Sequence, residues 1–414
     1  MWLGRGRRLR LLGGFVLAVA LVFLATSVAA PSSAQSALAC SPSWQTVPIA
    51  PTPDGYEIDG GVAAQSPTDA WAAGGDGLNA PSFIERWDGA QWSLSWQAPQ
   101  DNVSPWSLAL NGVAAAAPSA AWAVGGSGYR IHPVIMSWNG SSWRTDHTPT
   151  LPHEGSLYAV AAVAPNDAWA VGAMWKHLRS WTLVEHWNGS SWQVVPSPNG
   201  GPSTLVRTTK GSGVPSGREP LSVSTLATIA VISPDDIWAV GGYDRALPSR
   251  TERGTYRPDY RVSLLNEHWN GTKWTLGPTP VMESRALPRN GLPTYGLDGI
   301  AAAPSGDLIG AADGRVWRFS GSTWTPDPSW KPIYDLMATT VTGPDDAWAM
   351  GSLSPDDLAA AHWDGNQWTP TTKLPATGTI DEAAASGPND SWAAGNLNPT
   401  TGDTNQQVML HYTC

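Results

Sequence analysis

The sequence predicts an all-β fold, a closed ring of seven four-stranded blades known as a β-propeller. Three observations lead to that prediction. A tryptophan-rich phrase recurs seven times along the chain. Each copy contains short segments of alternating hydrophobicity separated by turn signals. The last copy lacks its final strand, and a matching strand is found near the start of the chain.

The repeat combines an Asp-Ala-Trp-Ala-Val-Gly phrase with a later Glu-His-Trp-Asn-Gly-Ser-Ser-Trp phrase. The first tryptophan falls at Trp71, Trp122, Trp169, Trp238, Trp348 and Trp392, and Leu308 takes its place once. The later pair falls at Trp87/Trp92, Trp138/Trp143, Trp187/Trp192, Trp269/Trp274 and Trp363/Trp368, with Phe319/Trp324 in the fifth copy. Successive copies lie roughly 40 to 70 residues apart, a spacing typical of large repeat units.

The third copy shows four strands, A to D, most clearly. We expect them at 157–164, 168–173, 182–187 and 192–195. Asn188-Gly189 between strands C and D is a strong hairpin signal, and Pro165 suits the turn between A and B. Period-two alternation without a helical pattern favours an all-β fold, and four strands in each repeat favour a propeller.

Residue size predicts where each strand lies. The small residues of strand A are expected to line the central channel, where the blades converge. The tryptophans are expected to fill the wider gaps between blades, each burying on the order of 200 Å². Glycines end strand B, where we expect a bulge or a close backbone approach; they are Gly74, Gly125, Gly172, Gly241, Gly351 and Gly395. Ala311 replaces this glycine in the fifth copy.

The two ends of the chain are expected to meet in the seventh blade. Tyr412 stands where the strand C tryptophan belongs, and no strand D follows it. The segment from Ser43 to Pro48 matches the segment from Ser191 to Pro196. We therefore expect the strand around Trp44 to complete the last blade, which removes the open edges of the array.

The same alignment places Cys40 and Cys414 in one C–D turn. A disulfide between them is geometrically plausible, and an exported protein can keep it. The alternative is a lipid-modified Cys40, because Ala37-Leu38-Ala39-Cys40 loosely resembles a lipobox. An intact-mass measurement distinguishes the two, since a disulfide changes the mass by about two daltons on reduction.

The first 39 residues predict a secretory leader. A positive segment (Arg5, Arg7, Arg8 and Arg10) precedes an apolar run from Leu11 to about Ala30, and small residues continue to Ala39. This pattern is typical of a cleaved signal peptide, covering 1–39 and leaving one propeller domain at 40–414. The apolar run is also long enough for an uncleaved signal anchor. Arg7-Arg8 raises the further alternative of a twin-arginine signal.

Charge narrows the classes of partner. The chain has 24 basic and 34 acidic residues and a net charge of −10. Cleavage of the leader leaves 20 basic and 34 acidic residues, a charge of −14. A nucleic-acid role needs a basic face, so we expect none. We expect a secreted monomer with no membrane insertion apart from the leader, or one tethered by the N-terminal segment or a lipidated Cys40.

The Gly-Gly ending of strand B and the later aromatic and tryptophan resemble the kelch repeat. The sevenfold set from 40 to 414 is similar to the propellers of the kelch and galactose-oxidase central-domain superfamily. It resembles still more closely bacterial secreted repeat proteins with Asp-x-Trp-Ala-Val-Gly and Trp-x-Gly-x-x-Trp phrases. The resemblance implies the propeller fold and no single activity, because propellers carry many functions.

Three insertions predict the working face. They fall at about 198–221, 243–261 and 278–295, all in B–C or D–A connections, which share one face of a propeller. Loops on a rigid scaffold commonly carry function; the alternative is surface that is merely tolerated. The candidate binding residues on this face are Tyr129, Arg130, Trp175, Lys176, His177, Arg179, Arg250, Arg253, Tyr256, Arg257 and Tyr260. Their basic and aromatic character suits an acidic glycan or a partner's carboxylates, or else describes a solvated loop.

Signals for catalysis are poor. Four histidines (His186, His268, His362 and His411) share one strand C position, which indicates a structural role. The aspartates of the A–B turns are explained by turn formation. We expect no cofactor and no metal. The sequence favours an extracellular binding module for a carbohydrate or protein partner. The alternative is a glycan-active hydrolase or lyase using Glu154, Asp244 or Glu252, and a third possibility is a spacer without a ligand.

Overall fold

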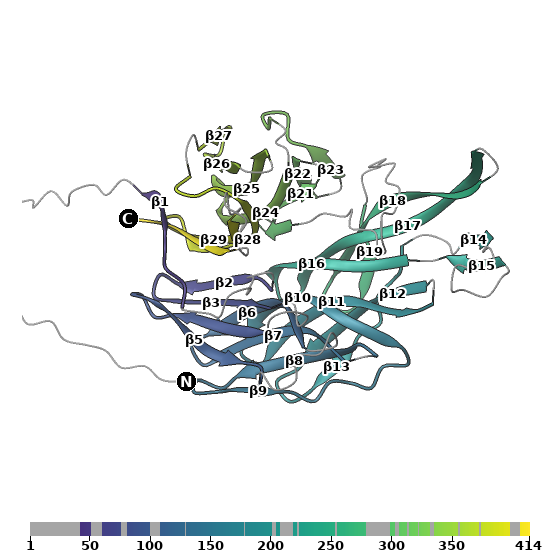
Figure 1. The fold of residues 1–414 in the computed structure, drawn as a ribbon, viewed down its shortest axis with the longest axis horizontal. Coiled ribbons are helices and arrows are strands. Elements are labelled where there is room, and N and C mark those ends of the chain that lie inside the picture. The colour runs from purple at the N-terminus through teal and green to yellow at the C-terminus, as the bar shows by residue number, and fades with distance from the viewer. Residues whose placement is uncertain are drawn as a thin grey trace, which may run out of the picture. The chain divides into compact units, whose positions relative to one another are not determined.

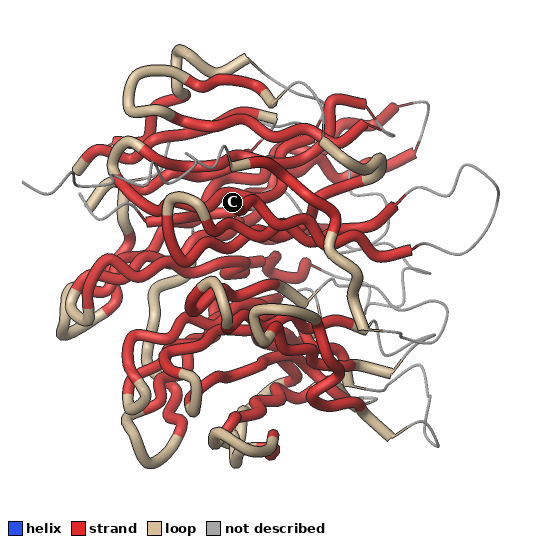
Figure 2. The backbone as a smooth tube through the Cα atoms, turned by 90° about the vertical axis from the view of Figure 1, so that its left-hand side faces the viewer, coloured by secondary structure: helices blue, strands red, loops and turns tan. Residues whose placement is uncertain are grey.

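The computed structural model describes residues 42–50, 60–75, 81–99, 108–128, 130–177, 179–200, 204–207, 218–221, 223–252, 255–278, 299–302, 306–312, 314–321, 323–331, 335–354, 357–371, 374–397 and 406–414. All of them belong to one compact unit, residues 42–414. The described residues form strands and turns (Figure 2). Within these ranges, no helix has the length and apolar character needed to cross a membrane.

Seven antiparallel sheets of four strands make up the unit (Figure 1). Blade one holds β2 (Val62–Ser66), β3 (Asp69–Gly74), β4 (Phe83–Trp87) and β5 (Trp92–Gln97). Blade two holds β6 (Ala109–Ala117), β7 (Ala120–Ser127), β8 (His132–Trp138) and β9 (Trp143–Thr145). Blade three holds β10 (Glu154–Ala164), β11 (Asp167–Lys176), β12 (Arg179–Trp187) and β13 (Trp192–Val194).

The remaining blades repeat this order. Blade four holds β16 (Val223–Ser233), β17 (Asp236–Glu252), β18 (Thr255–Trp269) and β19 (Trp274–Leu276). Blade five holds β20 (Gly299–Ala302), β21 (Leu308–Ala312), β22 (Arg315–Ser320) and β23 (Thr323–Pro326). Blade six holds β24 (Asp335–Gly343), β25 (Asp346–Ser354), β26 (Asp357–Trp363) and β27 (Trp368–Pro370). A separate hairpin, β14 (Thr204–Arg207) and β15 (Arg218–Leu221), precedes blade four.

Blade seven joins the two ends of the unit. It consists of β28 (Thr379–Gly387), β29 (Asp390–Leu397), β30 (Gln406–Thr413) and, outermost, β1 (Ser43–Thr46). Trp44 stands opposite Tyr412 in the β1–β30 register, and the Val47 N–H donates to the Met409 carbonyl at 2.9 Å. The predicted closure is confirmed. Cys40 lies outside the described residues, so its pairing with Cys414 stays a prediction, as do the expectations for residues 1–39.

The innermost strands form the ring. The pairs in contact are β2 with β6, β6 with β10, β10 with β16, β16 with β20, β20 with β24, β24 with β28, and β28 with β2. Seven hydrophobic clusters lie between successive blades, one at each junction. The predicted seven-bladed β-propeller is therefore confirmed.

The strand B tryptophan of one blade packs on the strand C and D aromatics of the next. Trp71 of blade one lies edge-on to Trp143 of blade two, with ring centroids 5.1 Å apart. Across the closure, Trp392 of blade seven lies 5.2 Å from Trp92 of blade one. Trp71 and Trp392 are fully buried, so the tryptophans fill the gaps between blades as predicted.

The junction between blades five and six lacks this contact, because Leu308 replaces the strand B tryptophan. Trp330, from the connection after β23, fills the space instead. Its ring lies perpendicular to Trp368 at 5.4 Å, and its indole N–H donates to the Gly314 carbonyl. Arg318 lies over Trp363, 3.8 Å from the ring centroid. A linker residue thus compensates for a departure from the repeat.

The four strand C histidines each bond to the aspartate of their own A–B turn. His186 lies 2.8 Å from Asp167 (Nε2 to Oδ1) and stacks on Trp169. In blade seven, His411 lies 2.6 Å from Asp390 and stacks on Trp392 at 3.7 Å. The same arrangement occurs at His268 with Asp236 and at His362 with Asp346. The histidines are therefore structural, as predicted.

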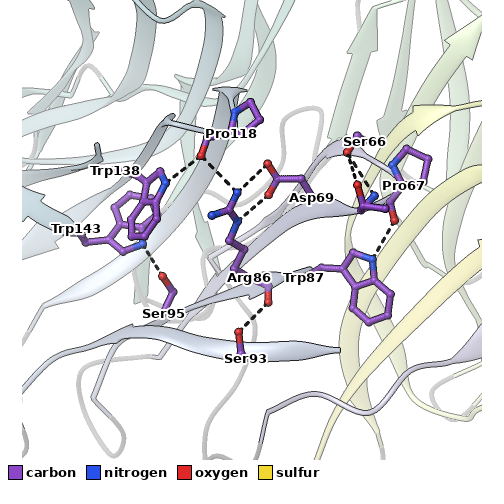
Figure 3. Close-up of polar contacts among 11 residues, drawn as sticks. Ser66, Pro67, Asp69, Arg86, Trp87, Ser93, Ser95, Pro118, Trp138 and Trp143 are labelled. Atoms are coloured by element: carbon purple, nitrogen blue, oxygen red, sulfur yellow. Dashed lines mark hydrogen bonds and ion pairs between the residues drawn. The ribbon is translucent and has the colours of Figure 1, made fainter. Parts of the chain in front are cut away.

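Blade one carries arginine in place of this histidine. Figure 3 shows Arg86 between Asp69 of its own blade and the Pro118 carbonyl of blade two. The guanidinium also lies 4.8 Å from the centroid of Trp71. One cation thereby fixes the A–B turns of two adjacent blades.

The strand B glycines permit a close backbone approach. A Cβ built on Gly172 would lie 2.0 Å from the Ser156 carbonyl oxygen, and one on Gly241 would lie 2.0 Å from that of Thr225. Facing these glycines, strand A carries a register irregularity, between Leu157 and Ala159 in blade three. Both parts of the prediction, a bulge and a close approach, hold at these positions.

Candidate functional site

The candidate site lies on the face formed by the B–C and D–A connections. On the opposite face, the described A–B turns are short, such as the two residues between β10 and β11. The B–C and D–A side bears the end of the β11–β12 hairpin, the β14–β15 hairpin and the ends of β17 and β18, which extend as a two-stranded ribbon (Figure 1). Among the described residues, the longer and more varied connections thus lie on the B–C and D–A face, where the insertions were expected.

Four predicted residues come together at the tip of the β11–β12 hairpin. Trp175 is half-buried, while Lys176, His177 and Arg179 are exposed. Lys176 stands directly opposite Arg179 in the register. His177 has a φ of 56°, in the left-handed region that few residues other than glycine adopt. The positive φ of His177 suits the tight hairpin turn that separates Lys176 from Arg179.

Blade two approaches this tip through the turn between β7 and β8. Arg130 is exposed in that turn, and Tyr129 lies outside the described residues. The N–H of Gly155 donates to the carbonyl of Ile131, next to Arg130, at 2.9 Å. Glu154, beside Gly155, stands opposite Trp175. The backbone bond therefore joins the Arg130 turn to the Trp175 hairpin.

Two site residues were not predicted. His153 and Trp181 stack with ring centroids 5.1 Å apart and an interplanar angle of 28°. Trp181 stands opposite Met174 on β11, one residue before Trp175. The sequence offers only a weak signal, since His153 has no counterpart in the other repeats and Trp181 lies outside the tryptophan phrases. The pair adds aromatic surface next to the cationic tip.

The expected insertion at 243–261 is mostly regular strand. It lies within β17 and β18, whose register continues to Glu252 opposite Thr255. Arg250 stands opposite Arg257, Tyr256 opposite Thr251, and Tyr260 opposite Ala246. Arg253 lies outside the described residues. The other insertions give the β14–β15 hairpin within 198–221, while nearly all of 278–295 lies outside the described residues.

The hairpins of blades three and four are fastened side by side. The Ser180 hydroxyl donates to the Ser224 carbonyl and accepts from the Ser224 N–H, both at 2.9 Å. Ser224 in turn stands opposite Tyr243 at the base of the β17–β18 extension. Both β14 and β15 contact β17. The face is thus one connected surface rather than separate loops.

The central channel offers a second concave region. A cavity of about 190 Å³ is lined by residues of all seven innermost strands, including Asn111, Tyr158, Thr228, Thr339 and Glu382. Burial raises the pKa of Tyr158. Small-molecule pockets usually measure about 300–1,000 Å³. This cavity is smaller than a usual small-molecule pocket, and we place the candidate site on the insertion face.

The acidic and metal-ligating side chains that the structure describes give little support to a catalytic function. Among the residues that the structure describes, no group of three histidine, cysteine, aspartate or glutamate side chains could hold a metal ion. A glycan hydrolase needs two carboxylates at a defined separation. Of the three candidates, only the side chain of Glu154 is described, and it is half-buried.

Three other carboxyl groups are buried within the blades. Glu85, Glu185 and Glu267 occupy one equivalent position in strand C and are fully buried. Burial raises the pKa of Glu85 to about 7 and those of Glu185 and Glu267 to about 8. Each stands opposite a strand B alanine, such as Ala170 for Glu185, far from the hairpin tips. We assign them to the packing between blades.

Comparison with known proteins agrees with the architecture. No family model matches the chain, and no curated protein does. Virginiamycin B lyase from Staphylococcus aureus is similar with a TM-score of 0.51 at 10% identity, over 90% of this chain and 100% of that one. The chain is a seven-bladed β-propeller.

Two further solved structures are similar over nearly their whole length. YCF48 bound to D1 peptide has a TM-score of 0.49 at 14% identity, over 90% of this chain and 95% of that one. The WD40 β-propeller domain of Doa1 has a TM-score of 0.49 at 12% identity, over 90% and 97%. Likeness at such low identity concerns the fold alone and leaves the ligand to be inferred from the site.

Proposed function

We propose that this propeller is an extracellular, non-catalytic binding module that recognises a carbohydrate or protein partner through its B–C and D–A face. The observation that carries the proposal is the tip of the β11–β12 hairpin. There Lys176 and Arg179 stand opposite each other, and the half-buried Trp181, two residues along β12 from Arg179, lies on the same side of the hairpin. Cations next to an accessible aromatic ring suit a ligand with acidic groups and flat apolar surfaces.

The scaffold supports this role because it is rigid where the site begins. Each hairpin rises from a blade whose tryptophans are buried between neighbours, and the Ile131–Gly155 bond ties blade two to blade three. Loops held by a stiff framework lose little conformational entropy on binding. The same logic places binding residues on loops in many folds.

Export of the protein is part of the proposal and rests on the leader pattern of residues 1–39 and on the low share of charged residues, 14%. A disulfide between Cys40 and Cys414 would fit an oxidising compartment. A relation to the kelch and galactose-oxidase propellers is likewise proposed from the repeat phrases.

A shortened hairpin tests the assignment of the face. Asp244 and Val262 stand opposite each other, so replacing residues 245–261 by Asn-Gly should close β17 and β18 with a two-residue turn. The full chain and this variant are screened against glycan, cell-wall and protein arrays. We expect binding in the full chain that is lost or weakened in the variant and in Trp175→Ala.

The control is Lys273→Ala, because Lys273 is exposed in a C–D turn on the opposite face. It should bind like the unmodified chain. Equal binding by the unmodified chain, the shortened variant and Trp175→Ala would overturn the proposed face. Thermal unfolding of each variant shows whether a loss of binding is a loss of fold.

A further inference from the structure

Glu267 is a buried carboxyl group at the junction between blades three and four. Its side chain is fully buried, and among the described residues neither of its carboxyl oxygens has a hydrogen-bond partner of normal geometry. It lies on β18 between Leu265 and Trp269, which belong to the hydrophobic cluster of this junction. Burying a carboxyl group without a partner is costly, so Glu267 is a candidate for a role beyond packing.

Residues 195–200, which we call the linker, connect blade three to the β14–β15 hairpin. The linker is bonded to strand C of blade three at Thr182. The Thr182 N–H donates to Asn199 Oδ1 at 2.9 Å, and the Thr182 hydroxyl lies 2.7 Å from that of Ser197. Because β14 begins at Thr204, four residues after the linker ends, these bonds fix where the hairpin starts on the candidate face.

The Thr182 hydroxyl has a single proton to donate. Its oxygen lies 3.2 Å from the Pro198 carbonyl oxygen and 3.3 Å from Asn199 Oδ1, and both of these oxygens can only accept. While Thr182 donates to them, the Ser197 hydroxyl must be the donor in the 2.7 Å bond between the two side chains. Ser197 then has no proton left to give to Glu267 and can only accept from it. The protonated form of Glu267 therefore completes this chain of hydrogen bonds, and the ionised form does not.

The surroundings of Glu267 favour its protonated form at neutral pH. Burial raises the pKa of Glu267 to about 8, and the Ser197 hydroxyl, which can turn to donate to the carboxylate, lowers that pKa in part. Neither cause is a neighbouring charge. The carboxyl group therefore holds its proton at pH 6 and loses it by pH 9.

Other titratable groups lie on the same junction. His186 of blade three, with its partner Asp167, stacks on Trp169 of the same cluster, and Tyr243 belongs to it from β17. The linker, β16 and β19 contain no titratable residue. On β18 itself, His268 stacks on a tryptophan on the side of blade five. A test of Glu267 must therefore exclude His186 as the source of a pH effect.

We propose that the proton on Glu267 controls how firmly the linker is held, so that the candidate binding face loosens in alkaline solution. In the protonated state, Glu267 donates to Ser197, Ser197 to Thr182, and Thr182 to the Pro198 carbonyl. Loss of the proton to solvent reverses the chain. Thr182 then donates to Ser197 and Ser197 to the carboxylate, and the linker loses the bond from the Thr182 hydroxyl. An effect on a ligand rests on the proposed function, whereas the effect on the linker does not.

Hydrogen exchange of the full chain at pH 6 and pH 9, corrected for the intrinsic pH dependence of exchange, tests the proposal. We expect protection of the linker amides to fall about fivefold at the higher pH, because one hydrogen bond is lost. Glu267→Gln should keep the linker protected at both pH values, since an amide N–H can donate to Ser197 as the protonated acid does. Ser197→Ala interrupts the chain and should also remove the pH dependence. The matched control is Glu185→Gln, which changes an equally buried carboxyl group and should leave the pH dependence of the linker intact.

Equal protection of the linker at both pH values in the unmodified chain would overturn the proposal. A pH dependence that persists in Glu267→Gln would assign the effect to another group, such as His186, and equal effects of Glu267→Gln and Glu185→Gln would assign it to the ring as a whole. If the linker loosens as expected but no array yields a ligand for the face, the proton switch stands and the proposed function falls. If a ligand binds the face and the linker does not respond to pH, the binding function stands and the switch falls.

Discussion

Trp44, four residues after Cys40, stands directly opposite Tyr412, two residues before the end of the chain. Their ring centroids lie 5.4 Å apart, and both contact Trp348 of blade six, at 5.1 and 4.7 Å. One aromatic group from the beginning of the propeller and one from its end thus pack on the preceding blade. The ring is closed by side-chain packing as well as by the β1–β30 ladder.

The Asp–His pairs should stabilise the protein in proportion to their burial. The side chains of His411 and Asp390 are 7% and 5% exposed, whereas those of His186 and Asp167 are each 27% exposed. Asp390→Ala leaves a buried histidine without its partner, and we expect a loss of about 2–3 kcal/mol in the free energy of unfolding.

The control is Asp167→Ala in blade three, where water can replace the lost partner and the expected loss is about 1 kcal/mol or less. Urea unfolding measures both. Equal losses in the two blades would show that burial of the pair does not matter.

Buried Glu185 should make stability depend on pH. Because burial raises the pKa of Glu185 from 4.5 to about 8, the folded state holds this proton at a pH where the unfolded chain has lost it. The free energy of unfolding therefore falls as the pH rises from about 4.5 to about 8, by at most about 5 kcal/mol for one group.

Glu185→Gln removes this dependence. We expect the variant to gain more than about 1 kcal/mol over the unmodified chain at pH 9, with no gain at pH 4. Glu154→Gln on the same blade controls for removal of a negative charge, because that side chain is only half-buried and should give a much smaller change. A Glu185→Gln gain that is the same at both pH values would contradict the assignment.

Gly172 should tolerate no side chain. A Cβ at this position would lie 2.0 Å from the Ser156 carbonyl oxygen, so Gly172→Ala must move backbone, and we expect a loss of about 1–3 kcal/mol. Gly387 is the matched control, because a Cβ added there would meet nothing within 4 Å. Gly387→Ala should be neutral within about 0.5 kcal/mol. Chemical denaturation of both variants checks the difference, and a neutral Gly172→Ala would refute it.

The repeat makes the architecture predictable from the sequence. The hairpin between strands C and D has a fixed length, so matching Trp44 to Trp192 is enough to place it opposite Tyr412, and the register agrees. Period-two alternation then sets which residues face a neighbouring blade. Such inferences hold because each blade has the same short-range geometry.

Features outside the repeat are harder to predict. Trp330 fills the space left by Leu308, but it lies in a linker with no counterpart in other copies. Glu185 has the sequence character of an ordinary polar strand residue. A signal is nevertheless present, since the equivalent positions carry Met136, Ala361 and Leu410, all of them buried and apolar.

The sequence predicts which basic and aromatic residues belong to the candidate site, but it does not predict which of them stand opposite each other across the hairpins. The opposition of Lys176 and Arg179 depends on a hairpin turn at His177, a residue that carries no usual turn signal. The 243–261 segment contains Pro248 and Pro258, which disfavour regular strands, so the sequence does not predict its extended pairing. Which residues stand opposite each other at this site depends on the strand register, and the composition of the segments does not reveal that register.

The most direct test of the closed ring is a double-mutant cycle between Trp44 and Tyr412. The free energies of unfolding of Trp44→Ala, Tyr412→Ala and the double variant are measured by urea denaturation, with Trp44→Ala/Trp192→Ala as a pair from separate blades. We predict a coupling energy of about 0.5–1.5 kcal/mol between Trp44 and Tyr412, and additivity for the separate pair. Additive losses at Trp44 and Tyr412 would contradict the closure of the last blade by the first strand.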